Sequence, residues 1–487
     1  MMDSRREVLQ GLKEKGILKS DPRLKGLVNA KTHEDIEHEK ETCSLLRRPS
    51  FIIPDFQGFC AKIEDIYEGL KEVEGGSLPT YIPELAEADP DLLGISLCTI
   101  DGQRQSYGDT SVEFCLQSCC KPILYAMALE ELGERTVHTH VGKEPSGRSF
   151  NDIALSPKGI PFNPMINMGA IMVSSLIHSS HLEDGHINAS RRYTHFLTTL
   201  NNLTGGTAPV SLSGSTYLCE KATADRNRGL AYIMKETSNT KPTGFPLHVK
   251  DGDDIEDVLD FYFMACSMQT TCDGVAAMAA TLANGGICPF TGFQVFSPES
   301  VKYVLSITES CGLYDWSGEG KVVIGLPIKS GVSGLLMIIV PGIAGFCVYS
   351  PPLDVCGNSV KGIEFCVRLG KTFPFHSFEH IVPRHGKEDP RCRKDEDIKV
   401  ATWMAIDAAE CGDLNTLKSF HAREFDLNLS DYDGRTPLHL AAASGSTDVV
   451  DFLVNVCRVG RNPKDRWGHT PQDEAKEYEE ILKLLSD

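Results

Sequence analysis

The chain has 487 residues, of which 41% are hydrophobic, and its formal net charge is −19. This length and apolar content allow two or three domains with their own cores. The acidic balance argues against nucleic acid as a partner, because phosphate binding needs a basic surface. The 17 cysteines are odd in number and include no Cys-x-x-Cys pair. They indicate reduced intracellular thiols and predict neither a disulfide framework nor a zinc or other metal site.

The N-terminal 50 residues are charged and helix-prone, with a break at Ser20-Asp21-Pro22. We expect a helical N-terminal segment over residues 1–50 that contains neither a signal peptide nor a clear transit peptide. The longest apolar run, Leu335 to Tyr349, is interrupted by Pro341-Gly342. It therefore predicts a pair of strands and no membrane span.

The main domain is expected over residues 51–380. Leu93 to Ile100 predicts a strand, Asp101-Gly102 a tight turn and Gln103 to Asp109 the returning strand. Helices are expected from Ser118 to about Asn202 and again over Asp260–Met268 and Asp273–Ala283. Cys311–Gly318 is expected to be a loop. Further strands are expected at Val322–Ile324, Gly334–Val340 and Ile343–Tyr349. This order predicts an α+β domain, in which both ends of the segment build one antiparallel sheet and a helical cluster packs on it.

A candidate nucleophile lies at the start of the first long helix, in the run Ser118-Cys119-Cys120-Lys121. Residues three apart share a helix face, so the Ser118 hydroxyl and the Lys121 amine can meet. Pro122 is tolerated only in the first helical turn, which places Ser118 at the helix N-terminus. Free N–H groups there favour a developing anion. A serine with an amine base and oxyanion donors is the minimum equipment for acyl transfer.

Spacing alone does not separate this pair from chance, since Ser238 and Lys241 form a second Ser-x-x-Lys in a polar stretch. A downstream Lys329-Ser330-Gly331 before a predicted strand strengthens the hypothesis. The two elements together are typical of serine acyl-enzymes of the β-lactamase and penicillin-binding type. The Ser-Asp-Asn element of those enzymes is missing, so another residue, such as a tyrosine, must relay the proton. Asn167 precedes an apolar helix, and on pattern alone we expect it to cap that helix.

The C-terminal part of the sequence is a repeat array. Thr436-Pro437-Leu438-His439-Leu440-Ala441 matches the ankyrin pattern, and Thr470-Pro471 repeats its start 34 residues later. Gly412 precedes Gly445 by 33 residues, which indicates an earlier unit. We expect a linker over residues 381–397 and all-α ankyrin repeats over residues 398–487. Such repeats bind proteins or pack against their own enzyme.

From about Phe51 onward the sequence resembles the animal-type, kidney- and liver-like glutaminases, a serine-dependent branch of the β-lactamase-like superfamily with C-terminal ankyrin repeats. The matching segments, in chain order, are LQSCCKP, VGKEPSG, NPMINMGA, ADRN, LDFYF, LANGG, CGLYDWSG, LPIKSGVSG and SPPLDVCGNSVKG. The resemblance implies hydrolysis of L-glutamine to L-glutamate and ammonia without a cofactor, with inorganic phosphate as an activator. It also implies a homodimer or homotetramer and a mitochondrial location, although a cytoplasmic one stays open because no transit peptide is evident.

The same resemblance implies roles for individual residues. Ser118 matches the nucleophile and Lys121 its base. The backbone N–H of Val332 is expected to join that of Ser118 in the oxyanion hole, and Tyr314 to share proton transfer. Ser118, Tyr314 and Val332 are also expected to bind substrate. The other expected substrate-binding residues are Tyr81, Gln117, Asn167, Glu220, Asn227 and Tyr262. Tyr81 is expected to be catalytic as well.

One departure concerns regulation. Asp152 stands in the loop Arg148–Ala154 where vertebrate-type enzymes of the family carry a lysine, so phosphate dependence does not follow from the resemblance.

Two other classes of protein remain as alternatives. One is a related serine amidase or peptidase, against which the acidic Glu220 argues. The other is a non-catalytic scaffold in which the ankyrin repeats carry the function.

Overall fold

The computed structural model describes residues 2–30, 32–43, 45–46, 50–80, 82–147, 152–153, 155–177, 189–238, 244–246, 249, 252–379, 386–391, 394–422 and 424–486. The chain divides into two compact units, Met1–His376 and Ser377–Asp487. None of the helices within the described ranges combines the length and apolar character that crossing a bilayer requires.

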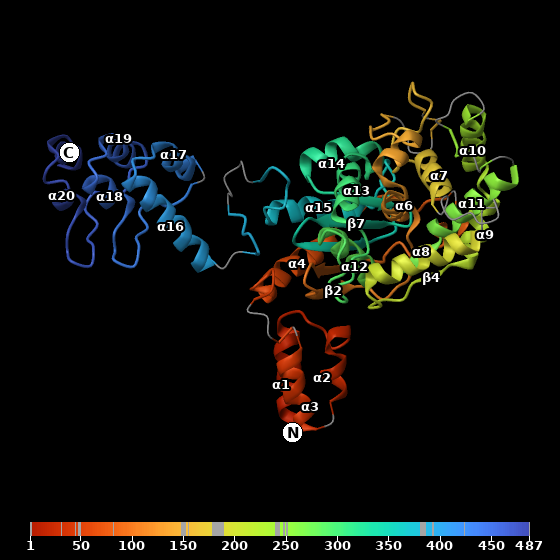
Figure 1. The fold of residues 1–487 in the computed structure, drawn as a ribbon, viewed down its shortest axis with the longest axis horizontal. Coiled ribbons are helices and arrows are strands. Elements are labelled where there is room, and N and C mark those ends of the chain that lie inside the picture. Colours follow the sequence, from red (N-terminus) through yellow and green to blue (C-terminus); the bar gives the residue numbers. More distant parts are fainter. Residues whose placement is uncertain are drawn as a thin grey trace. The chain divides into compact units, whose positions relative to one another are not determined.

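The first unit is built around a five-stranded antiparallel sheet in the order β2-β1-β8-β7-β6 (Figure 1). The strands are β1 (Gly94–Thr99), β2 (Arg104–Gly108), β6 (Ile328–Gly331), β7 (Leu335–Val340) and β8 (Ala344–Tyr349). In the central pair, β1 and β8, Leu97 faces Phe346. Strands from the two ends of the domain thus share one sheet, which confirms the predicted α+β architecture.

Helices cover both faces of this sheet. Side chains alternate between the faces along each strand. Leu336 and Ile338 of β7 pack with the helices α4 (Phe56–Leu70) and α15 (Val360–Thr372). Met337 and Ile339 belong to the larger core on the other face, against α12 (Cys272–Ala283). Because each face is buried, the central strands β7 and β8 are apolar at nearly every position.

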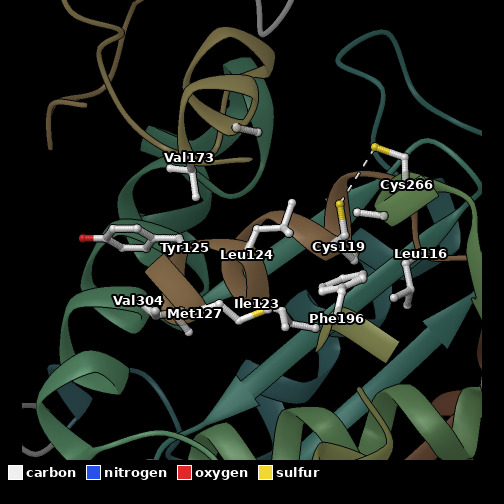
Figure 2. Close-up of a cluster of buried hydrophobic side chains, with 14 of the residues drawn as sticks. Leu116, Cys119, Ile123, Leu124, Tyr125, Met127, Val173, Phe196, Cys266 and Val304 are labelled. Carbon is white, nitrogen blue, oxygen red and sulfur yellow. Dashed lines mark hydrogen bonds between the residues drawn. The ribbon is translucent and has the colours of Figure 1, made fainter. Parts of the chain in front are cut away.

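The larger core continues into a helical cluster. Its further helices are α5 (Pro83–Ala86), α6 (Lys121–His140), α7 (Asn167–Leu176), α8 (Ala189–Thr204), α9 (Gly214–Ala222), α10 (Asp225–Ser238), α11 (Gly252–Cys266), α13 (Pro298–Cys311) and α14 (Ser317–Val323). A small sheet of β3 (Phe114–Cys115), β5 (Met268–Thr270) and β4 (Ser211–Leu212) adjoins it. Figure 2 shows Ile123 and Met127 of α6 in one buried group with Phe196 of α8 and Val304 of α13. This packing fixes the direction of α6, which begins at the candidate active site.

The N-terminal segment forms a small helical layer on the β1–β2 turn. Its elements are α1 (Met2–Glu14), a 3₁₀ turn η1 (Pro22–Leu24), α2 (Lys25–Asn29) and α3 (His33–Thr42). The predicted break is confirmed, since the Asp21 carboxylate accepts the backbone N–H of Arg23 and caps η1. The Arg23 guanidinium donates to the carbonyl of Asp101, and the Gln103 amide donates to that of Lys15. These bonds join the segment to the sheet.

Two expectations for the region before β6 are wrong. The expected strand Val322–Ile324 is the end of helix α14 and the residue that follows it. Val322 is 77% exposed and lies within this helix. The expected loop Cys311–Gly318 contains a 3₁₀ turn, η4 (Tyr314–Trp316), which leads into α14. The Ser317 hydroxyl donates to the Tyr314 carbonyl and stabilises this junction.

The second unit is helical, as predicted. Its elements are α16 (Lys394–Glu410), α17 (Leu414–Ala422), α18 (Pro437–Ala443), α19 (Thr447–Asp451), a π-helical turn η6 (Phe452–Val456), α20 (Pro471–Glu474) and α21 (Glu479–Ser486). Thr436 and Thr470 each begin a helix with a capping box, and each is followed by proline. Gly412 and Gly445 both have positive φ, at 72° and 73°, so equivalent turns recur in successive units.

Candidate active site

The candidate nucleophile lies in a tight turn between the small sheet and α6. Residues Gln117–Cys120 form the 3₁₀ turn η2, and Lys121 begins α6 directly after it, with Pro122 in the first turn as expected. In a 3₁₀ turn residues three apart are eclipsed, so Ser118 and Lys121 share one side. Ser118 is 7% exposed and Lys121 is 1% exposed. Gln117 has a φ of 46°, a strained value for a residue with a side chain, and such strain is common at functional sites.

The Lys121 amine is buried next to polar amides. Burial lowers the pKa of Lys121 from its usual range. Its Nζ donates a hydrogen bond of 2.6 Å to Oδ1 of Asn167, and Nδ2 of Asn167 donates to Oδ1 of Asn227 at 3.1 Å. Tyr262 also donates to Oδ1 of Asn167, at 3.3 Å. A lowered pKa favours the neutral amine, which is the form that can accept a proton.

The expectation that Asn167 caps the apolar helix is wrong. The residue at the N-cap of α7 is Ile166, which makes no side-chain capping bond. Asn167 is the first residue of the helix, and its amide is committed to Lys121 and Asn227. The spacing of an asparagine before an apolar run could not distinguish these roles, because the partners lie 46 and 60 residues away.

Strand β6 lies directly against the nucleophile turn. A Cβ on Gly331 would come within 2.9 Å of the Leu116 carbonyl oxygen, so only glycine permits this approach. The Cys119 thiol donates to the Lys329 carbonyl at 3.2 Å, and the Ser333 hydroxyl donates to the Cys115 carbonyl at 2.8 Å. These contacts hold the turn after β6, with the backbone of Val332, beside Ser118.

Tyr314 and Lys329 form a second buried group beside the nucleophile. The Tyr314 phenol donates to the Ser330 carbonyl at 2.9 Å and also shares a hydrogen bond with the Ser118 hydroxyl. Burial raises the pKa of Tyr314, and the bond with Ser118 partly offsets that rise. The Lys329 amine lies 4.4 Å from the centre of the Tyr314 ring and donates to the carbonyls of Ser330 and Gly312. Burial and the neighbouring charge of Lys121 lower the pKa of Lys329 to about 7.

A cavity of about 80 Å³, here called the substrate cavity, opens at Ser118. Its lining combines residues from the four helices α7, α9, α10 and α11, the nucleophile turn η2, the turn after β6 and loop positions: Ile82, Gln117, Ser118, Asn167, Glu220, Thr223, Ala224, Arg226, Asn227, Tyr262, Cys266 and Val332. Glu220 is its buried acid. The Glu220 carboxylate accepts hydrogen bonds from the Gln117 amide at 3.4 Å and from the Ser267 hydroxyl at 3.5 Å. Burial nevertheless raises the pKa of Glu220 to about 7.

Seven of the ten residues expected from the sequence therefore line one cavity. Tyr314 and Lys121 do not line it, but Tyr314 contacts Ser118 and the Lys121 amine donates to Asn167. Tyr81 lies outside the described residues. Sequence reasoning missed Cys266 and Arg226 as parts of the lining and Lys329 as a titratable group, although the Lys-Ser-Gly element pointed to Lys329 and the run ADRN contained Arg226.

Arg226 connects the cavity to the loop that departs from the family pattern. Its guanidinium forms an ion pair of 3.4 Å with Asp152. Both side chains are about half exposed, at 54% and 48%, so the pair itself contributes at most about 1 kcal/mol. The contact places the altered loop position beside Arg226, which directly precedes Asn227 in the sequence.

Within the described part of the chain, one group of potential metal ligands lies in the second unit. Among the described residues, Asp465, His469 and Glu474 hold ligand atoms within 4.8 Å of one another. The Arg435 guanidinium already lies 3.2 Å from the Glu474 carboxylate, and Asp465 accepts the backbone N–H of His469. These partners account for the cluster as a repeat turn held by charge, so we assign it no metal.

Comparison with known proteins identifies the family. A family model described as glutaminase matches residues 76–378, and a model of ankyrin repeats matches residues 405–487. The "Glutaminase liver isoform, mitochondrial" of Rattus norvegicus is 44% identical over 442 residues, which cover 90% of this chain and 71% of that protein. The "Putative glutaminase 2" of Caenorhabditis elegans is 43% identical, with 87% of this chain and 68% of that protein covered.

Solved structures agree. The structure titled "Probable glutaminase ybaS" superposes with a TM-score of 0.60 at 32% identity, over 66% of this chain and 99% of that one. Mglu in its tris and glutamate form superposes with a TM-score of 0.59 at 34% identity, over 65% and 67% of the two chains. The chain belongs to the glutaminase family, enzymes that hydrolyse L-glutamine to L-glutamate and ammonia.

Proposed function

We propose that this chain hydrolyses the side-chain amide of L-glutamine through an ester formed on Ser118. The observation that carries the proposal is the substrate cavity, in which a buried serine beside a buried lysine faces a buried carboxylate, Glu220. A hydroxyl with a neutral amine base suits acyl transfer. A carboxylate in the same cavity suits a substrate that carries an ammonium group.

Free glutamine is a zwitterion, and the cavity offers a complement to each charge. Glu220 binds the α-ammonium group in its ionised form. Asn167, Asn227 and Tyr262 supply amide and hydroxyl donors for the α-carboxylate. Gln117, which already donates to Glu220, orients that carboxylate. Binding both charged groups directs the side-chain amide toward Ser118. Contacts to the α-ammonium and α-carboxylate groups thereby position the amide carbon for attack.

In the acylation step the neutral amine of Lys121 accepts the proton of the Ser118 hydroxyl, whose oxygen attacks the amide carbon. The backbone N–H groups of Ser118 and Val332 stabilise the oxyanion, and one such donor is typically worth about 10²–10³ in turnover. The C–N bond then breaks. The leaving nitrogen takes its proton from Lys121 or through Tyr314 and departs as ammonia.

In the deacylation step water attacks the ester carbon and Lys121 accepts a proton from it. The oxyanion forms again at the same two N–H groups. When it collapses, Ser118 recovers its proton and L-glutamate leaves. The pKa of Lys121 supports this double use, because burial lowers it and so favours the neutral amine that accepts a proton in each step.

Ammonia release from L-glutamine tests the proposal, with wild type and Ser118→Ala measured side by side. We expect release by wild type and a loss of at least about 10³-fold in the variant. Removing the nucleophile should lower turnover more than removing a single oxyanion donor does. Wild-type turnover by Ser118→Ala would overturn the mechanism. No release by wild type would favour the alternative in which the ankyrin repeats form a binding scaffold.

Regulation and assembly extend the proposal. We propose that the enzyme assembles as a homodimer or homotetramer and that inorganic phosphate modulates it through the loop containing Asp152. The ion pair between Asp152 and Arg226 supports a link between that loop and the substrate cavity. Activity and light scattering, each measured with and without phosphate, test this proposal. Equal activity and equal mass under both conditions would rule phosphate out as an effector.

Location and partners are inferred from the relatives. The rat and mouse relatives are named mitochondrial, and we propose the same location for this enzyme. The ankyrin repeats are proposed to bind a protein partner. Imaging of the tagged full-length protein against a mitochondrial marker tests the location, and cytosolic signal alone would contradict it.

A further inference from the structure

A second cavity, here called the outer cavity, is lined by Tyr314, which does not line the substrate cavity. It has a volume of about 260 Å³. Four segments enclose it, namely the loop before residue 148, the turn before α7, the end of α13 and the junction of η4 with α14. The lining residues are Pro145, Ser146, Gly147, Asn163, Met165, Ile166, Ser310, Cys311, Tyr314, Asp315, Ser317 and Gly318.

Tyr314 connects the outer cavity to the nucleophile. Its side chain lines the outer cavity, and its phenol shares a hydrogen bond with Ser118, which lines the substrate cavity. Its backbone has a φ of 54°, which costs energy for a residue with a side chain, and the Ser317 hydroxyl holds that turn. The fold therefore maintains a strained turn that places one phenol between the nucleophile and a second open space.

The lining indicates what this space can hold. Asp315 is the single charged residue among the described residues that line it, and hydroxyl, amide and phenol groups supply the other polar contacts. Among these described lining residues, a carboxylate such as glutamate would meet one negative charge and no cation. Water fits such a lining, and so does ammonia, which becomes a cation once protonated.

We infer that the outer cavity is the route by which ammonia leaves and the hydrolytic water reaches the ester on Ser118. This inference rests on the proposed function. The glutamyl group occupies the substrate cavity throughout the life of the ester, so a second approach to Ser118 is needed while the ester exists. Tyr314 is the residue that links this approach to the nucleophile.

The bonds that change fit this route. Acylation breaks the C–N bond, and the nitrogen leaves with the proton taken from the Ser118 hydroxyl. In deacylation the oxygen of one water forms the new C–O bond, the ester bond to Ser118 breaks, and one water proton returns to the Ser118 oxygen. On the inferred route, ammonia departs from, and water arrives at, the side of the acyl carbon next to Tyr314.

Gly318 offers a way to fill the outer cavity without touching catalytic groups. A Cβ on Gly318 would meet no atom within 4 Å, and the residue lies in α14 without positive φ. Gly370 in α15 is a matched control, because its Cβ would also meet nothing within 4 Å and it does not line either cavity. Both Gly318→Trp and Gly370→Trp are expected to fold.

The test compares kcat, KM and isotope exchange in the full-length enzyme. With ¹⁵N-ammonium added, an ester that reacts with ammonia returns labelled glutamine, so the label measures passage of ammonia to Ser118. For Gly318→Trp we expect kcat and the rate of label incorporation to fall together, by about tenfold, with KM unchanged, because transit becomes limiting. Gly370→Trp should match wild type in all three.

Four outcomes separate the claims. Gly318→Trp behaving like Gly370→Trp would overturn the route, and so would a rise in KM with unchanged kcat, which would indicate a disturbed substrate cavity. Asp315→Asn gives an independent check. Removing that charge should weaken inhibition by added ammonium about two- to fivefold, and unchanged inhibition would contradict the role of Asp315. If wild type releases no ammonia from glutamine, the proposed function itself fails.

Discussion

The amine of Lys121 donates to Oδ1 of Asn167 at 2.6 Å, and this bond connects the base to the amides that receive substrate. Nδ2 of Asn167 continues the connection to Asn227 at 3.1 Å. A neutral acceptor beside the amine leaves the lowered pKa of Lys121 in place, since it adds no negative charge. The identity of residue 167 therefore bears on the protonation of the base as well as on binding.

Asn167→Asp tests that relationship. A carboxylate next to Lys121 should stabilise the charged amine and raise its pKa, because opposite charges within hydrogen-bond distance favour ionisation. We expect the acidic limb of the kcat profile to move to higher pH by about one unit or more, with lower activity at pH 7. Asn227→Asp is the matched control, because Asn227 is hydrogen-bonded to Asn167, whereas Asn167 is the residue that accepts from Lys121. Identical acidic limbs in wild type and Asn167→Asp would contradict the link.

Glu220 predicts a pH dependence of substrate binding. Its pKa is raised to about 7 by burial, so the carboxylate that meets the ammonium group forms as the pH rises through about 7. KM for glutamine should therefore fall as the pH rises from 6 to 8, about tenfold for each unit below the pKa. KM of Glu220→Gln should be high and constant over the same interval. A KM of wild type that does not change between pH 6 and 8 would refute this role.

The same residue predicts an effect on stability with the opposite sense. The ordinary pKa of 4.5 is raised to about 7 in the folded state. The folded state therefore holds a proton that the unfolded state has lost, and stability declines as the pH rises through this interval. The decline amounts to roughly 3 kcal/mol above pH 7, at about 1.4 kcal/mol for each unit. We expect Glu220→Gln to be at least as stable as wild type at pH 8 in thermal unfolding; a clear loss of stability would count against a destabilising buried charge.

Gly331 predicts that the spacing between β6 and the nucleophile turn controls turnover. Gly331→Ala places a Cβ 2.9 Å from the Leu116 carbonyl oxygen, so β6 must move away from Ser118. We expect kcat to fall about 10- to 10²-fold, because small displacements of oxyanion donors are costly. Gly370→Ala, in open space, should leave kcat unchanged. Full activity in Gly331→Ala would exclude a role for this close approach.

The ankyrin unit predicts a change in stability without a change in chemistry. The Thr436 hydroxyl hydrogen bonds with Nδ1 of His439 as part of the capping box of α18. Thr436→Ala should cost about 1 kcal/mol in the unfolding of that unit. Glutamine turnover should not change, because the residue lies in the second compact unit. Urea unfolding followed by circular dichroism, with turnover measured in parallel, checks both parts.

Local sequence patterns predicted the sheet, the helical cluster and the repeats. The turn at Asp101-Gly102 and the proline after Lys121 act over a few residues, so their consequences were visible without neighbours. The error at Val322–Ile324 has the opposite cause. Three β-branched residues favour a strand locally, but the helix begun at Ser317 continues there instead.

The site was predictable only where motifs marked it. Ser118 and Lys121 belong to one turn, so spacing brings them together. The amide of Asn167 and the amine of Lys329 take their roles from partners elsewhere in the chain, and no local periodicity encodes such contacts. The resemblance to the family supplied the substrate-binding residues, and the close approach of Gly331 to Leu116 became apparent only from the folded backbone.

The identity of the nucleophile is tested most directly by trapping the ester. Wild type and Ser118→Ala are mixed with L-glutamine, quenched in acid during turnover, digested and examined by mass spectrometry. The mechanism predicts a glutamyl adduct on the wild-type peptide that contains Ser118 and no adduct in the variant, which should also release no ammonia. A glutamyl adduct on a different residue, or rapid glutamine hydrolysis by Ser118→Ala, would contradict it.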